Sequence, residues 1–324
     1  MASSKNYYMA PFASLCMFLL LLSFTNTASA QRGLSTNFYR TRCPNFATIV
    51  QSAVRSAVRN EQRMGASLLR LHFHDCFVGG CDASVLLDAQ GGEKQSVHNV
   101  GSLRGFGVID TIKQRLEAAC PGVVSCADIL SLAAKESVVA LGGPSWNVEF
   151  GRRDSTSRPS ASAADAELPF GSDNVPNLVS LFSRKGFSVR ELVALSGAHT
   201  VGQARCLRFR DRAHREQNIL PSFAQFLQRI CPLNGGDNNL GPLDVRSPNA
   251  FNNDYFRDLT NFQGLLHSDQ VLFTGRGSQT DAIVRLYANN QGVFFNDFAA
   301  AMLKMSRLRV LTGRTGTIRR NCRR

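Results

Sequence analysis

The segment RLHFHDCFVGGCDAS, residues 70–84, decides how the rest of the chain is interpreted. It follows the apolar stretch ASLL and ends in a short loop that contains two glycines and is bounded by two cysteines. The residues before the loop predict a helix. On this helix Arg70 and His74 are four residues apart and share a face, whereas His72 points to the opposite side. Only one of the two histidines can therefore share a site with the arginine.

An arginine and a histidine on one helix face can cleave a peroxide bond. A neutral imidazole takes a proton from one oxygen and returns it to the other, while the guanidinium stabilises the negative charge that develops there. We interpret His74 as the proton acceptor and Arg70 as the stabilising cation. On these two residues alone, a surface arginine beside a buried packing histidine is the alternative.

The loop after this helix is rich in oxygen ligands, which are typical of a calcium site. The side-chain candidates are Asp75, Asp82 and Ser84, and the carbonyl candidates are Val78 and Gly80. The loop does not match the twelve-residue helix-loop-helix calcium pattern. A polar turn closed by a short disulfide is therefore the competing interpretation.

The first thirty residues are expected to be a signal peptide. Lys5 precedes an apolar run at residues 11–24, and residues 28–30 read Ala-Ser-Ala, the form of a signal-peptidase site. The mature domain would then cover residues 31–324. No later segment approaches the roughly 20 apolar residues of a membrane helix, so we expect an exported protein without a membrane anchor.

Eight of the nine cysteines lie after this leader. An even number of cysteines in an oxidising compartment predicts four disulfides, although their spacing does not assign the pairs. The same usage argues against a zinc site built from His72, His74, Cys76 and Cys81, which the spacing would otherwise allow.

The formal net charge of the chain is +13. The basic residues are scattered, without a basic run or interleaved aromatic residues, which argues against nucleic-acid binding. The excess serves either solubility alone or attraction to a polyanion, for which acidic polysaccharide is the expected partner outside the cell. A basic polyanion-binding protein with little catalysis is therefore an alternative function, which would be wall-bound if the family resemblance described below holds.

The fold is expected to be mainly α with very little β, because apolar residues recur at helical spacing and long alternating patterns are missing. Beyond the helix before the calcium loop, helical stretches are predicted at 125–141, 175–184, 188–198, 223–230 and 295–308. Two long irregular stretches, 154–173 and 231–253, interrupt them. Loops of that length within a compact domain are usually functional.

Six motifs stand in the order found in the plant secretory (class III) haem peroxidases, and the chain after the leader resembles that family throughout. They are RLHFHDCFVGGCDAS, EKQSVHNVGSLRGF, CPGVVSCADIL, GGPSWNVEFGRRDS, ELVALSGAHTVGQARC and GLLHSDQVLF. The resemblance implies two helical halves, distal and proximal, that sandwich one haem b. It also implies a monomer that reduces hydrogen peroxide and oxidises small phenolic donors in the cell wall.

The resemblance assigns the distal pocket to Arg70, Phe73 and His74. Asn99, with Glu93 nearby, would bond the far ring nitrogen of His74 and keep the other nitrogen basic.

On the proximal side the resemblance makes His199 the axial iron ligand and Asp269 the acceptor of its ring proton. Leu192, Leu195 and His199 stand at helical spacing, so the imidazole is expected on an apolar helix face. Pro169 would line the channel for aromatic donors.

Two calcium ions are implied. The distal ligand set adds Glu93 to Asp75, Val78, Gly80, Asp82 and Ser84. The proximal set is Thr200, Asp244, Ser247, Ala250 through its carbonyl group, and Asn252. The family usually has threonine at position 247 and aspartate at position 252. This chain therefore lacks one negative ligand, and we predict weaker calcium binding at the proximal site.

The resemblance also implies disulfide pairs. They are Cys43–Cys120, Cys76–Cys81, Cys126–Cys322 and Cys206–Cys231.

A catalase-like activity is the rival enzyme class, but it requires a tyrosine iron ligand, and the contexts of Tyr39, Tyr255 and Tyr287 do not indicate one. The physiological donor, among lignin units, wall tyrosines and phenolic esters, is not specified by the sequence.

Overall fold

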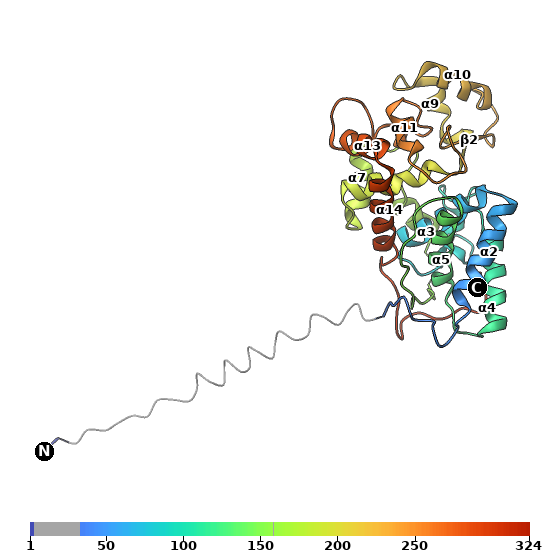
Figure 1. The fold of residues 1–324 in the computed structure, drawn as a ribbon, viewed down its shortest axis with the longest axis vertical. Helices are drawn as coiled ribbons and strands as arrows, with labels where there is room; N and C mark the ends of the chain where they lie inside the picture. The colour runs from blue at the N-terminus through green and yellow to red at the C-terminus, as the bar shows by residue number, and fades with distance from the viewer. Residues whose placement is uncertain (3–32, 158) are drawn as a thin grey trace.

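The computed structural model describes residues 1–2, 33–157 and 159–324. The predicted signal peptide, apart from its first two residues, lies outside these ranges. The fold is mainly helical, as the sequence predicts, and has two stacked halves (Figure 1). The first half contains α2 (Phe46–Asn60), α3 (Arg63–Phe77), α4 (Phe106–Ala119), α5 (Cys126–Ala140) and the short 3-10 helices η2 (Ser84–Leu86) and η3 (Glu93–Gln95).

The second half begins after the long connection that follows α5. Helix α6 (Ala161–Glu167) lies in that connection and packs against η3 of the first half. The α-helices of the second half are α7 (Val175–Arg184), α8 (Val189–Ser196), α9 (Arg210–Arg215), α10 (Pro221–Ile230), α11 (Asp254–Thr260), α12 (His267–Gln270), α13 (Gln279–Asn289) and α14 (Gln291–Met305). Its 3-10 helices are η4 (Gly197–Thr200) and η5 (Cys206–Arg208). The strands β1 (Gln203–Arg205) and β2 (Leu240–Pro242) pair antiparallel.

Helix α5 is the centre of the first half, and α2 and α3 both pack against it. It is buried around most of its surface, as expected for a helix that is apolar on nearly all sides. Ser125 caps its first turn by accepting a hydrogen bond from the backbone N–H of Asp128. This packing fixes α3, which carries Arg70 and His74.

Four disulfides close the fold, and they join the same pairs that the resemblance implies. They are Cys43–Cys120, Cys76–Cys81, Cys126–Cys322 and Cys206–Cys231. The third of these ties the C-terminus back to the first half, where Figure 1 shows the chain end beside α4 and α5. The two halves are therefore joined covalently at the chain's end as well as through their packing.

Two details differ from the sequence expectation. Helix α8 ends at Ser196, and His199 lies on the 3-10 turn η4 instead of on a continuous α-helix. A Cβ at Gly197 would lie 2.5 Å from Phe294 and 2.7 Å from Phe256, so close packing requires glycine where the helix tightens. The stretches predicted to be irregular also contain regular secondary structure, because 154–173 includes α6 and 231–253 includes β2.

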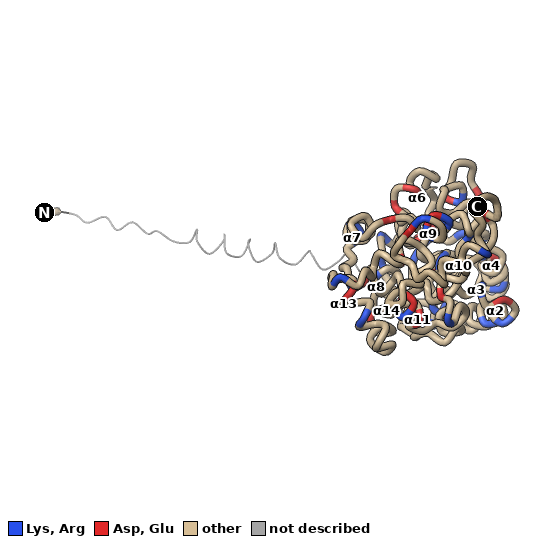
Figure 2. Tube along the Cα trace, turned by 90° about the horizontal axis from the view of Figure 1, so that it is seen from above, with Lys and Arg blue, Asp and Glu red and all other residues tan. Residues whose placement is uncertain are grey.

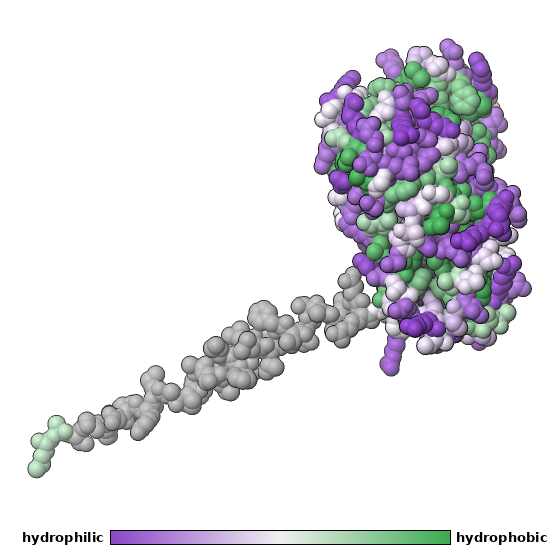
Figure 3. All heavy atoms as spheres, in the orientation of Figure 1, coloured by the Kyte–Doolittle hydropathy of each residue, from purple (hydrophilic) through white to green (hydrophobic). Residues whose placement is uncertain are grey.

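In the described residues, no helix combines the length and the apolar character that a membrane span requires. Basic residues are distributed around the trace in Figure 2, without one continuous run. The face seen in Figure 3 is largely hydrophilic, with small apolar areas between.

Candidate active site

A cavity of about 460 Å³ lies between the two halves, within the range of roughly 300–1,000 Å³ typical of ligand pockets. Much of its wall is apolar. Six residues predicted from the sequence line it together: Arg70, Phe73, His74, Pro169, His199 and Asp269. Residues separated by up to 199 positions are thus brought to one cavity.

His74 is held in one orientation by a chain of two hydrogen bonds. Its Nδ1 lies 2.6 Å from Asn99 Oδ1, and Asn99 Nδ2 donates to the backbone carbonyl of Glu93 at 2.8 Å. Because the second bond identifies the amide nitrogen, Asn99 Oδ1 must be an acceptor and His74 Nδ1 must carry the proton. The other nitrogen, Nε2, therefore carries a free lone pair.

The electrostatics of the distal wall keep His74 neutral. Burial lowers the pKa of His74 well below its usual value, and the charge of Arg70 lowers it further. Arg70 itself is fixed by hydrogen bonds from Nη2 to the carbonyl of His98 at 2.8 Å and to Ser102 Oγ at 3.2 Å. A neutral imidazole and a fixed guanidinium group therefore lie on the same wall of the cavity, where the predicted proton acceptor and stabilising cation would be needed.

His199 occupies the proximal side of the cavity. Its Nδ1 lies 2.8 Å from Asp269 Oδ1, and 39% of its side chain is exposed, on the side that lines the cavity. Burial alone would lower the pKa of His199, but the charge and hydrogen bond of Asp269 raise it above the usual value. With Nδ1 donating to a carboxylate, Nε2 is left as an electron-rich nitrogen that is suited to bind a metal ion.

Tyr255 is a neighbour that sequence reasoning missed. Its hydroxyl donates to the same Asp269 oxygen at 3.0 Å, so Asp269 accepts from both Tyr255 and His199. Burial and the charge of Asp269 raise the pKa of Tyr255 well above its usual value. The hydroxyl therefore remains a proton donor. Only the spatial proximity of α11 to α12 identifies this role, because no local sequence pattern signals it.

The distal loop presents buried oxygens that nothing in the described residues satisfies. They are Asp75 Oδ1, Ser84 Oγ, Glu93 Oε1 and Glu93 Oε2. Burial, with the nearby charge of Asp82, raises the pKa of Asp75 well above its usual value, and burial raises that of Glu93 to about 8. Unsatisfied buried carboxylates are costly unless a cation balances them. The loop therefore fits a bound cation.

The donor types at this loop favour calcium. In the described chain, no three His, Cys, Asp or Glu side chains meet around one point, so hydroxyl and carbonyl oxygens would have to contribute, as calcium allows. Gly80 adopts φ 130°, and a Cβ there would lie 2.7 Å from Arg309. The loop therefore requires glycine for its turn. The rival zinc site is excluded, since Cys76 and Cys81 are bonded to each other.

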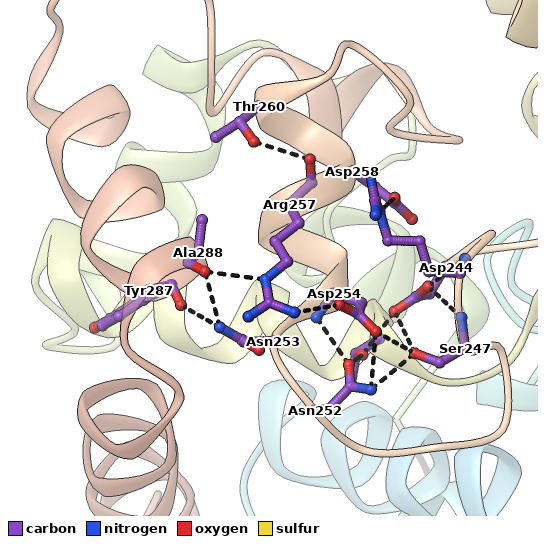
Figure 4. A network of polar contacts seen from close by, with 12 residues as sticks. Asp244, Ser247, Asn252, Asn253, Asp254, Arg257, Asp258, Thr260, Tyr287 and Ala288 are labelled. Atoms are coloured by element: carbon purple, nitrogen blue, oxygen red, sulfur yellow. Dashed lines mark hydrogen bonds and ion pairs between the residues drawn. The ribbon is translucent and has the colours of Figure 1, made fainter.

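The proximal cluster is arranged differently (Figure 4). Asn252 Nδ2 donates to Ser247 Oγ at 2.8 Å and to Asp254 Oδ2 at 3.1 Å. Thr200 Oγ1 donates to Asp244 Oδ2 at 2.9 Å and lies 3.2 Å from Asn252 Oδ1. The side chains thus satisfy one another, and an amide N–H group lies among the oxygens that a cation would need. These residues fit calcium less well than the distal loop does.

A profile of the family described as Peroxidase matches residues 50–290. The chain belongs to the class III plant peroxidases. This peroxidase is 53% identical to Peroxidase 4 of Vitis vinifera over 308 residues, 94% of each chain. It is 54% identical to Peroxidase 2 of Oryza sativa subsp. japonica, covering 94% of this chain and 96% of the relative. It is 50% identical to the lignin-forming anionic peroxidase of Nicotiana sylvestris, covering 96% of both chains.

This peroxidase is therefore a haem-dependent enzyme that uses hydrogen peroxide and a reducing donor. The cavity fits haem, because apolar walls surround two histidines whose Nδ1 atoms are hydrogen-bonded and whose Nε2 atoms have no hydrogen-bond partner within residues 33–157 and 159–324. The catalase-like alternative has no support at the tyrosines. Tyr39 bonds Asp128, Tyr287 bonds Asp297, and Tyr255 stands behind Asp269.

Further cavity residues were not predicted from the sequence. His98, Phe170 and Arg208 all line the cavity. His98 precedes Asn99 and Phe170 follows Pro169, so their position next to predicted site residues was a weak indication that they line the cavity. Arg208 lies at the end of η5, and no feature of the sequence near it indicated that it would line the cavity.

Proposed function

We propose that this peroxidase holds one haem b through His199 and reduces hydrogen peroxide with electrons from small phenolic donors. One observation carries the proposal. The two histidines that line one cavity each have Nδ1 engaged, by Asn99 on one side and by Asp269 on the other. Haem, when bound, supplies the redox chemistry that exchanges electrons with peroxide and with the donor.

On the distal side, His74 Nε2 would take a proton from one peroxide oxygen and return it to the other oxygen, which departs as water once the O–O bond breaks. The neutral state of His74 suits this role, and Asn99 keeps the basic nitrogen turned into the cavity. Arg70 stabilises the negative charge of the departing oxygen. Phe73 restricts the room beside His74.

On the proximal side, Asp269 holds the Nδ1 proton of His199 and increases the electron donation of the imidazole. Pro169 borders the part of the cavity where a donor enters. The alternative of a wall protein without catalysis is not favoured, because Arg70, His74 and His199 all line the cavity.

We propose two calcium sites that differ in their affinity for calcium. A tight site would use the distal loop, with Asp75, Asp82, Ser84, Glu93 and the carbonyls of Val78 and Gly80. A weaker site would use the proximal cluster, with Thr200, Asp244, Ser247, the carbonyl of Ala250 and Asn252. The unsatisfied oxygens of the first and the internal bonds of the second support this ranking.

We also propose that residues 1–30 are removed as a signal peptide and that the mature domain, 31–324, acts as a monomer in the cell wall. Its net positive charge would favour retention by anionic polysaccharide. Membrane and nucleic-acid partners are not proposed.

The test is to express the mature chain, load it with haem, and measure the Soret absorbance and the peroxide-dependent oxidation of guaiacol. We expect an intense Soret band and steady turnover. A folded protein that takes up haem but shows no turnover of peroxide would refute the proposed activity.

A further inference from the structure

The cavity that contains the two histidines is strongly positive. Asp269 is the one carboxylate among the described residues that lines it, and its oxygens are engaged by His199 and Tyr255 and by the backbone of Leu266. Five arginines line the same cavity: Arg63, Arg70, Arg104, Arg205 and Arg208.

Most of these positive charges lack an acidic partner. Arg104 pairs with Glu61 at 2.7 Å, but the other four arginines form no ion pair within the described part of the chain. The charges are close enough to repel one another. Burial lowers the pKa of Arg70 to about 10, and the charges of Arg208 and Arg63 contribute to the shift.

Haem does not remove this excess. Haem b carries two carboxylates, which can neutralise two of the four unpaired guanidinium groups. Positive charge therefore remains on the wall after haem has bound, in a partly dehydrated space where electrostatic attraction is stronger than in water. A ligand that brings its own negative charge is favoured there.

Arg208 is the unpaired arginine beside an aromatic wall. It is solvent-exposed at the end of η5, and its guanidinium donates to the backbone carbonyl of Val97, which precedes His98. The rings of His98 and Phe170 lie 4.0 Å apart, centroid to centroid. A Cβ on Gly171, next to Phe170, would lie 3.9 Å from the carbonyl oxygen of Arg208. Cation and rings therefore border the same part of the cavity.

The nearby carboxylates of Asp165 and Asp173 do not form an ion pair with Arg208. Asp165 accepts from the backbone N–H of Val97 at 3.0 Å, and Asp173 accepts from that of Phe170 at 2.8 Å. Neither acid lines the cavity. A guanidinium has five N–H donors, so Arg208 retains donors for a ligand. His98 is only 8% exposed, and its Nε2 has no partner in the described residues.

We propose that this peroxidase prefers phenolic donors that carry a carboxylate, and that Arg208 binds this carboxylate while the phenol ring lies against His98 and Phe170. The inference rests on the proposed function and narrows its donor class. Arg208 is thereby a specificity-determining residue, and the peroxide-cleaving residues are unchanged.

The test compares 4-hydroxycinnamic acid with its methyl ester, which has the same ring and no charge at neutral pH. Binding of each is measured by optical difference titration of the resting haem-loaded protein without peroxide, and KM and kcat are then measured with peroxide. We expect the acid to bind about twofold to fivefold more tightly than the ester, because Arg208 is solvent-exposed and an exposed ion pair contributes only modestly to binding. Added salt should weaken binding of the acid and leave the ester unaffected.

Arg208→Gln should remove most of this preference and raise KM for the acid more than it lowers kcat, while Arg208→Lys should retain part of it. The matched control is Arg215→Gln, which removes the same charge from an exposed helix position and should leave the preference unchanged. Equal affinity for acid and ester in the wild type, or an unchanged preference in Arg208→Gln, would overturn the inference. These outcomes are separable from failure of the proposed function, in which peroxide turnover itself would be missing.

Discussion

The distal loop and the proximal cluster are predicted by the same resemblance to bind the same ion, yet they satisfy their oxygens in opposite ways. At the distal loop, Asp75, Ser84 and Glu93 hold buried oxygens without partners among the described residues. At the proximal cluster, Asn252 bonds Ser247 and Asp254 through a single amide nitrogen.

The difference teaches that a ligand set cannot be judged from its oxygens alone. An unsatisfied buried carboxylate requires a counter-charge, whereas an amide that donates to two acceptors supplies part of that balance itself. The first half of the molecule should therefore depend on calcium more than the second half does. Both regions lie next to a site histidine in sequence, since Asp75 follows His74 and Thr200 follows His199.

The histidines give the largest contrast between the halves. His74→Ala should retain the Soret band and lower peroxide turnover by about 10²- to 10⁴-fold, as for removal of a general acid–base group. His199→Ala should instead lose haem, since this variant removes the imidazole that we propose as the iron ligand. Soret absorbance per folded chain and stopped-flow kinetics distinguish the two. His214→Ala, which changes a histidine outside the cavity, is the control, and equal effects of the first two variants would contradict the assignment.

The second largest effect is expected from calcium removal, which should destabilise the distal loop more than the proximal cluster. Calcium at about a hundred times its Kd stabilises a folded protein by about 2.7 kcal/mol, and a chelator should remove that stabilisation from the distal loop. Asp75→Asn should lower the thermal midpoint in calcium and be insensitive to chelator. Asp211→Asn, an exposed acid, serves as the control. If Asp75→Asn still loses stability on chelation as the wild type does, the distal assignment is wrong.

Much of this contrast could be predicted from the sequence. The helix that carries Arg70 and His74 follows from apolar spacing, and the oxygen-rich loop follows from the residues after it. The ordered motifs then identify the family and the ligands that the resemblance implies. Local patterns suffice wherever the functional groups lie within one turn of each other.

The rest depends on contacts between distant segments, which periodicity does not encode. Tyr255 meets Asp269 only because α11 packs near α12. His199 lies on the 3-10 turn η4 beyond the end of α8, next to Gly197, where Phe294 and Phe256 leave no room for a side chain. Asp254, two residues beyond the expected ligand Asn252, enters the proximal cluster through that amide. Each of these features is decided by packing in the second half.

Asn252→Asp should sharpen the comparison by making the proximal cluster resemble the distal loop. The change replaces an N–H donor with a charged oxygen near Asp244 and Asp254, so like charges repel without calcium and attract it when it is present. We expect a loss of about 1 kcal/mol in chelator, recovered in calcium, and a second tight site in calorimetric titration. Asn234→Asp on an exposed loop is the matched control. Two equally tight sites in the wild type would contradict the ranking.

Tyr255→Phe should give the smallest effect and acts on the proximal side alone. The variant removes one of the two hydrogen bonds that Asp269 Oδ1 accepts, at a cost of about 0.5–1.5 kcal/mol in unfolding free energy. In the variant, Asp269 Oδ1 accepts a hydrogen bond from His199 alone, so this hydrogen bond should become stronger. The imidazole should then donate more electron density to the iron, and the reduction potential of the iron should fall. Spectroelectrochemical titration measures the shift. Tyr39→Phe loses a comparable hydrogen bond, to Asp128. Neither residue lines the cavity, so this variant should leave the potential unchanged. An equal shift in both variants would mean that general loosening of the fold, and not competition for Asp269, controls the proximal histidine.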